Sequence, residues 1–105
     1  MYQEMYQQAK GDFSEAIRLD AEYIAAYINR GSIYLDQRDF DLALIDYSEA
    51  VSLDPDNGRA FAGRAATYTL LGDDTNGRRD FERAVELGID RVQLEKTIEG
   101  IKNQR

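Results

Sequence analysis

The sequence of 105 residues contains no cysteine and no histidine, and it has only one proline. Without cysteine the chain has neither disulfide bonds nor thiolate metal ligands, and without histidine it lacks the commonest general base and a common zinc ligand. No glycine-rich loop followed by lysine is present to cradle a phosphate. We therefore predict that the protein is not an enzyme and that it holds no metal and no cofactor.

Long apolar segments are also missing. No apolar run approaches the 18 or so residues that cross a bilayer, and the N-terminus lacks the basic and apolar regions of a signal peptide. These absences predict no membrane partner. A cytoplasmic location is the default expectation.

Positive charge is scarce in the first half of the chain. The formal net charge is -7, and residues 1–57 hold twelve acidic and four basic side chains, whereas residues 58–105 hold eight acidic and nine basic ones. Nucleic-acid binding requires a basic stripe that neutralises phosphates. The acidic balance therefore argues against a nucleic-acid partner.

The chain does contain an internal repeat of 34 residues. A period of this length is the signature of repeat architectures, in which each unit packs on its neighbours. A further partial copy precedes the two full ones, with Ala9, Asp12, Phe13 and Ala16 lying 34 residues before Ala43, Asp46, Tyr47 and Ala50. The two full copies match at Tyr27 and Phe61, Arg30 and Arg64, Gly31 and Ala65, Tyr34 and Tyr68, Asp46 and Asp80, Tyr47 and Phe81, and Ala50 and Ala84.

The unit at residues 24–57 resembles the tetratricopeptide repeat. The large and small residues of that family's pattern fall on Tyr27, Gly31, Tyr34, Ala43, Tyr47, Ala50 and Pro55. The second copy departs from the pattern, with Gly77 in place of the alanine and Ile89 in place of the proline. The resemblance covers nearly the whole chain and implies an all-α fold, a right-handed superhelical α-solenoid of antiparallel helix pairs.

We expect one domain over residues 1–105, with six helices. Residues 1–23 read as the second helix of a truncated repeat, 24–57 and 58–91 as full repeats, and 92–105 as a C-terminal capping helix. The helices are predicted near residues 2–19 (or from 6), 23–37, 40–53, 58–71, 74–87 and 91–102.

Polar and glycine residues at the helix boundaries predict caps. Asp39, Asp56 or Asn57, and Asp90 stand at expected helix starts, and Gly88 stands at an expected end. Residues 54–58 superficially resemble a calcium loop, but the glycine comes one residue early and Ala65 replaces the glutamate. We interpret this segment as a helix stop and cap.

Arginine and aspartate recur in phase. Because a partly buried arginine needs a carboxylate partner, Arg30 and Arg64 predict structural ion pairs with aspartates of the same phase, such as Asp46 and Asp80. Anion binding by these arginines is the alternative hypothesis.

The resemblance implies a concave groove, lined by the first helix of each repeat, that accepts a peptide or helix of a partner protein. The small residues Ala62, Gly63 and Ala66 would leave room for that partner, or alternatively would only tighten helix packing. We expect the groove residues to be Ala25, Ile28, Asn29, Ser32, Asp36, Arg59, Ala62, Gly63, Ala66, Leu70 and Lys96.

Some relatives of this family hold the terminal carboxylates of chaperone tails with a clamp of lysine, asparagine and arginine. Asn29 and the basic Arg59 occupy two of its positions, but Gly63 stands where the clamp has arginine. Because such a grip needs convergent donors, we expect the groove to bind an apolar or mixed segment instead.

An alternative function is self-assembly. The first helix lacks the partner that would precede it in a complete repeat, which leaves Tyr2, Tyr6 and Phe13 on an uncovered face. Exposed apolar patches of this kind mark interfaces. A homo-oligomer formed through this face is therefore the second hypothesis.

Overall fold

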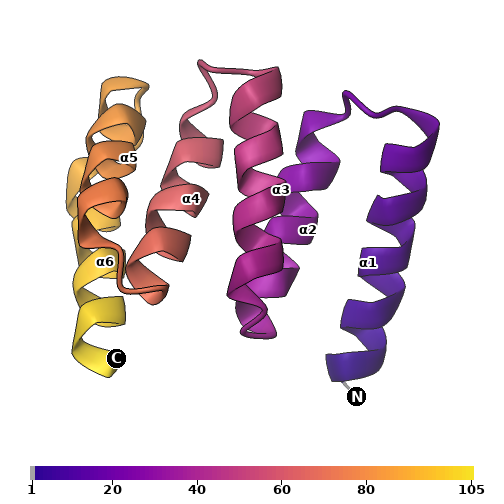
Figure 1. The fold of residues 1–105 in the computed structure, drawn as a ribbon, viewed down its shortest axis with the longest axis horizontal. Coiled ribbons are helices and arrows are strands. Elements are labelled where there is room, and N and C mark those ends of the chain that lie inside the picture. The colour runs from indigo at the N-terminus through magenta and orange to yellow at the C-terminus, as the bar shows by residue number, and fades with distance from the viewer. Residues whose placement is uncertain (1) are drawn as a thin grey trace.

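The computed structural model describes residues 2–105, which form six α-helices and no strand (Figure 1). This confirms the all-α prediction, and the observed bounds lie within about two residues of the predicted ones. The helices are α1 (Tyr2–Leu19), α2 (Ile24–Asp36), α3 (Phe40–Leu53), α4 (Gly58–Leu70), α5 (Asp74–Glu86) and α6 (Arg91–Gln104).

The helices stack as antiparallel pairs in the manner of an α-solenoid. α2 packs against α3, and α4 packs against α5. Each pair meets the next because α3 also packs on α4, while α2, α4 and α6 lie beside one another in series. α1 makes its main contact with α2, at one end of the stack (Figure 1).

Side chains and glycines fix several helix ends. The side-chain oxygens of Asn57 and Asp90 accept hydrogen bonds from the backbone N–H groups of Ala60 and Gln93, at 3.2 and 3.0 Å, which satisfies donors left unpaired at a helix start. Asp39 stands before α3 as predicted, but its side chain makes no capping bond. The expected Gly88 lies after α5 with a φ of 104°, a conformation that favours glycine.

The core repeats with the sequence. One buried cluster joins Tyr27, Ala43 and Tyr47 of the first full repeat to Ala60 of the next, and a second cluster contains Phe61, Ala65, Phe81, Ala84 and Leu94. The alanines at the helix contacts let the backbones approach closely enough for the aromatic rings to fill the space between layers.

Two ion pairs cross the helix pairs, as predicted. Arg30 donates through Nε and Nη2 to the two carboxylate oxygens of Asp46, both at 2.8 Å. Arg64 donates to Asp80 in the same way, at 2.7 and 3.1 Å. The two aspartates are only 2% and 1% exposed. Each buried carboxylate therefore needs its arginine to offset the loss of hydration.

Candidate functional site

The exposed side of α2, α4 and α6 carries most of the predicted groove residues. Because these three helices lie beside one another, their outer sides form one continuous face. On this face Ala25, Ser32, Asp36, Arg59 and Lys96 are exposed, while Asn29, Ala62, Gly63 and Leu70 are half-buried.

Two predicted groove residues lie in the interior instead. Ile28 is 5% exposed and belongs to the core cluster that includes Ala60 of α4, and Ala66 is 9% exposed. The prediction that these two side chains face outward is therefore wrong. The physical reason is that α2 packs directly on α4, a contact between first helices that a one-repeat pattern does not specify.

The ring of Tyr47 lies between α2 and α4. A Cβ atom at Gly63 would be 2.2 Å from Tyr47 Cε1, and one at Gly31 would be 3.1 Å from Tyr47 Cε2. Real Cβ atoms do not approach an aromatic carbon as closely as the first of these distances. At Gly63 the missing side chain is therefore needed for packing, which was the alternative interpretation of the small residues.

Three predicted groove residues influence the pKa of Tyr47. Burial raises the pKa of Tyr47 to about 12, Ser32 and the charge of Arg59 act to lower it, and the carboxylate of Asp36 adds to the rise. In the sequence, Tyr47 was identified only as part of the repeat pattern, and its link to the groove residues was not predicted. The available signal is that the position holds tyrosine in this copy and phenylalanine, at Phe13 and Phe81, in the other two.

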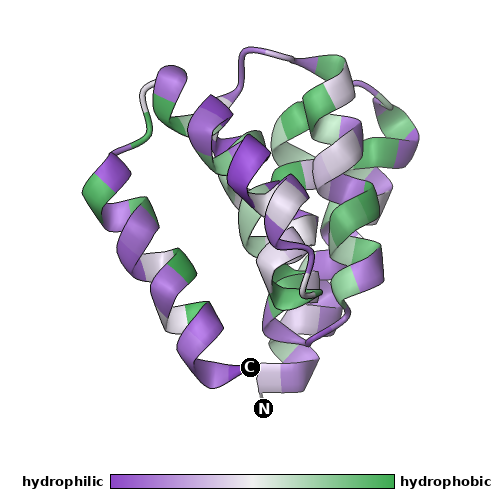
Figure 2. Cartoon of the chain, turned by 60° about the vertical axis from the view of Figure 1, so that its left-hand side comes forward, coloured by the Kyte–Doolittle hydropathy of each residue, from purple (hydrophilic) through white to green (hydrophobic). Residues whose placement is uncertain are grey.

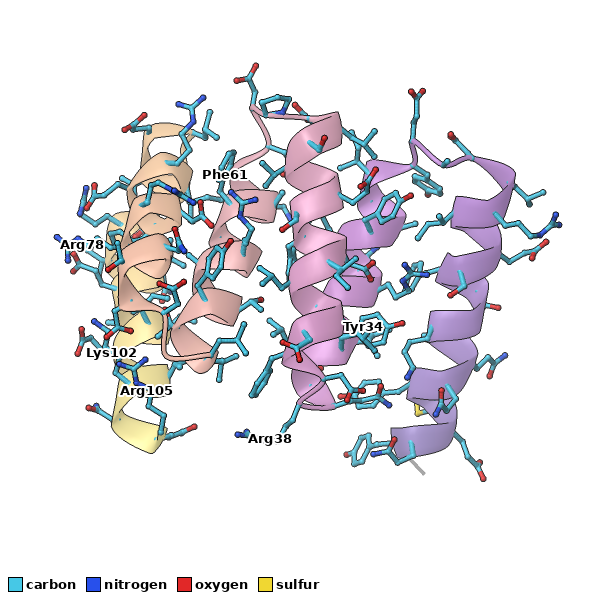
Figure 3. All side chains as sticks on the ribbon, in the orientation of Figure 1. Tyr34, Arg38, Phe61, Arg78, Lys102 and Arg105 are labelled. Atoms are coloured by element: carbon cyan, nitrogen blue, oxygen red, sulfur yellow. The ribbon has the colours of Figure 1, made fainter. Side chains whose placement is uncertain are left out.

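A shallow recess lies where α4 ends. Leu70 shares it with Arg38, Ile101, Gln104 and Arg105, and its volume is about 160 Å³. Figure 3 shows Arg38 and Arg105 on the lower side of the view. Arg105 is held there by a 2.8 Å hydrogen bond to the Thr69 carbonyl and by an ion pair with Asp74. The recess thus combines an apolar base with basic side chains.

A larger pocket of about 250 Å³ opens between α5 and α6. Figure 2 shows α6 as a mostly hydrophilic helix at the left of the view. Thr97, which has the same phase as Gly63, is exposed, and Ile98 packs on the cluster of Phe81 in its place. The repeat pattern alone did not predict this pocket. Its lining residues are Thr69, Asp74, Gly77, Arg78, Phe81, Glu95, Ile98, Glu99 and Lys102.

The three residues predicted for self-association differ in exposure. Tyr2 is exposed, whereas Tyr6 and Phe13 are half-buried. The Tyr6 hydroxyl donates a 3.1 Å hydrogen bond to Asp36 on α2, and this bond raises the pKa of Tyr6. The prediction that Tyr6 lies on an uncovered face is therefore wrong, because its hydroxyl faces α2.

The acidic segment at residues 54–58 forms the turn into α4. Asp54 accepts a hydrogen bond from the backbone N–H of Asp56 at 3.1 Å, and Asn57 caps the helix. Across residues 2–105, no three or more acidic side chains gather in a way that would hold a metal ion. None of the helices in this part of the chain has the length and hydrophobicity to span a bilayer.

Comparison with known proteins gives one match in sequence and several in structure. The family model of the tetratricopeptide repeat matches residues 24–57. No curated protein matches the chain. The first TPR of Spaghetti (RPAP3), solved with the HSP90 peptide SRMEEVD, is similar with a TM-score of 0.86 and 23% identity, over 98% of this chain and 82% of that one.

Two further solved structures share the fold. The TPR2B domain of yeast Sti1, in its complex with pHsp70, is similar with a TM-score of 0.83 and 19% identity, over 99% of this chain and 88% of that one. YrrB, described as a TPR protein with an unusual peptide-binding site, gives a TM-score of 0.76 and 23% identity, over 88% of this chain and 47% of that one. At these identities the likeness concerns the fold.

Proposed function

We propose that this chain, which contains a tetratricopeptide repeat at residues 24–57 and has the tetratricopeptide-repeat fold, is a protein-interaction module. It binds a peptide or helical segment of a partner protein on the groove face, defined as the outer side of α2, α4 and α6. The observation that carries this proposal is that α2, α4 and α6 pack beside one another with Ser32, Asp36, Arg59 and Lys96 exposed on them.

The groove face suits a segment of mixed polarity. The amide of Asn29 can both donate and accept hydrogen bonds, which pairs it with a peptide backbone. Asp36 and Arg59 supply opposite charges on neighbouring helices, and half-buried Ala62 and Leu70 supply apolar surface. A partner segment with apolar side chains between a basic and an acidic residue would satisfy all of these groups.

The chaperone peptides seen with two of the similar structures support a peptide as the class of ligand. A terminal-carboxylate clamp is a poorer fit here. An arginine at position 63 would collide with Tyr47, because even a Cβ atom there lies too close to the ring. Asn29 and Arg59 alone provide too few convergent donors for that grip. We therefore place an internal, mixed segment in the groove.

Selection from a random peptide library would test this proposal, with the selected peptides mapped by amide chemical shifts. We expect shifts at Asn29, Ser32 and Ala62, and loss of binding in Asn29→Ala and Ala62→Arg. Ile45→Arg on α3 is the matched control, because Ile45 is 63% exposed and belongs to a second helix of the repeat. Binding that survives both groove substitutions, or shifts confined to α1, would refute the groove.

A further inference from the structure

α1 carries the same docking pattern as α3. On α3 the four residues Ala43, Asp46, Tyr47 and Ala50 are buried. They form the surface that receives α2, since Arg30 pairs with Asp46 and Gly31 lies against the Tyr47 ring. The residues 34 positions earlier are Ala9, Asp12, Phe13 and Ala16, which differ only in the tyrosine hydroxyl. A surface built to receive a helix is therefore repeated on α1.

On α1 this surface is open. Asp12 is exposed, and no group in residues 2–105 forms a hydrogen bond or ion pair with its side chain, while Ala9, Phe13 and Ala16 are only half-buried. Tyr2, Met5 and Leu19 extend the surface and are 78%, 67% and 72% exposed. We define the open face of α1 by six residues that are spaced three and four positions apart and therefore lie on one side of the helix. These residues are Tyr2, Met5, Ala9, Asp12, Ala16 and Leu19.

The helices that fit this kind of surface share a pattern within the chain itself. α2 and α4 each present an aromatic residue, then arginine three positions later, then a small residue, then tyrosine. The arginine reaches the buried aspartate and the small residue admits the aromatic ring. Charge complementarity at Asp12 therefore requires an arginine at the same place in the occupant.

A second copy of the chain does not offer such a helix at its other end. In α6 the positions of the aromatic, the arginine, the small residue and the tyrosine are held by Glu95, Ile98, Glu99 and Lys102. If α6 of one copy packed on α1 of the next, Ile98 would lie against Asp12 and Glu99 against Phe13. The Asp12 carboxylate would then have no arginine partner. Pairing two α1 helices would bring two Asp12 carboxylates into one interface without a free cation from α1, because Arg18 is paired with Glu15 and Lys10 lies over the ring of Tyr34.

We propose that the open face of α1 docks an amphipathic helix of another protein, with an aromatic residue, arginine, a small residue and tyrosine at relative positions 0, 3, 4 and 7. Asp12 pairs with that arginine as Asp46 pairs with Arg30. This surface contains none of the groove-face residues. It is thus a second docking site, independent of the peptide site proposed above.

A synthetic peptide with the sequence of residues 21–38 is the probe, because it carries the α2 pattern. Titrated into the intact chain, it should bind and shift the amides of Ala9, Asp12 and Ala16. Asp12→Ala in the chain, or Arg30→Ala in the peptide, should each weaken binding about tenfold or more, and the two changes together should weaken it little further. Glu4→Ala, an exposed carboxylate off the open face of α1, is the control and should leave the affinity unchanged.

Charge exchange gives the sharpest test. Asp12→Arg should abolish binding of the natural probe and restore it for the probe carrying Arg30→Asp. Binding that ignores Asp12, no binding at millimolar probe, or failure of this rescue would overturn the proposal. Sedimentation showing a dimer of the chain alone that Met5→Arg dissociates would also overturn it, since the occupant would then be a second copy.

Discussion

α1 and α3 present matching side chains at four positions with the same spacing, differing only in the hydroxyl of Tyr47, yet the two helices lie in different surroundings. α3 packs between α2 and α4, and its Asp46 and Tyr47 are buried. α1 packs on α2, so that Asp12 is exposed and Phe13 is half-buried. Whether the pattern becomes core or open surface is decided by the neighbouring helices. The following predictions test this difference, from the largest expected effect to the smallest.

Removing the aspartate should separate the two helices most clearly. Asp46→Ala leaves Arg30 without its buried partner and should lower the free energy of unfolding by about 3 to 5 kcal/mol. Asp12→Ala removes an exposed carboxylate and should change it by less than about 0.5 kcal/mol. Urea unfolding of both variants measures the difference. Equal losses would show that Asp12 is also bound within the chain.

At the shared aromatic position, alkaline pH should act on α3 and not on α1, because α3 has Tyr47 where α1 has Phe13. The pKa of Tyr47 is raised to about 12 in the folded chain from 10.0, so the folded state retains the proton while the unfolded state loses it. This contribution is complete below pH 10 and is lost as pH rises toward 12, by about 2 to 3 kcal/mol. Comparison with Tyr47→Phe, in which this loss is absent, isolates it from other tyrosines. Parallel curves for the two proteins would contradict the shift.

The glycine beside Tyr47 offers a third test. Gly63→Ala forces a methyl group into the Tyr47 ring and should cost about 1 to 3 kcal/mol. Asn29 follows Phe13 at the same spacing as Gly63 follows Tyr47, and it already carries a larger side chain than glycine. Asn29→Ala should therefore change the free energy of unfolding by less than about 0.5 kcal/mol. Thermal melting compares them. A neutral Gly63→Ala would mean that the ring of Tyr47 moves freely.

Gly11 in α1 should give the smallest effect, with the opposite sign. An added Cβ meets nothing within 4 Å, so Gly11→Ala should stabilise the chain by up to about 1 kcal/mol through helix propensity. Gly100→Ala in α6 is equally unobstructed and serves as the reference. If Gly11→Ala destabilised the chain, α1 would be packed against something on that side.

Much of the fold follows from the 34-residue phase. Residues that recur in phase predicted the helix pairs and the Arg30–Asp46 and Arg64–Asp80 ion pairs, because these contacts lie within one repeat. The burial of Ile28 and Ala66 did not follow, because it depends on how closely the first helices of successive repeats approach. The pocket beside α6 was not predicted either, because α6 departs from the repeat pattern, with Glu95 and Glu99 where α4 has Phe61 and Ala65. Apart from Ile28 and Ala66, the residues expected in the groove are at least partly exposed on α2, α4 and α6, whereas the place of the Tyr47 ring between α2 and α4 was not predicted.

Amide hydrogen exchange along α1 and α3, with and without the peptide of residues 21–38, tests the central claim most directly. If neighbouring helices decide the fate of the shared pattern, amides near Asp12 should exchange through local opening, while those near Asp46 exchange only on global unfolding. The peptide should slow exchange near Asp12 and leave α3 unchanged. Equal protection of both helices in the chain alone, or no response of α1 to the peptide, would contradict the claim.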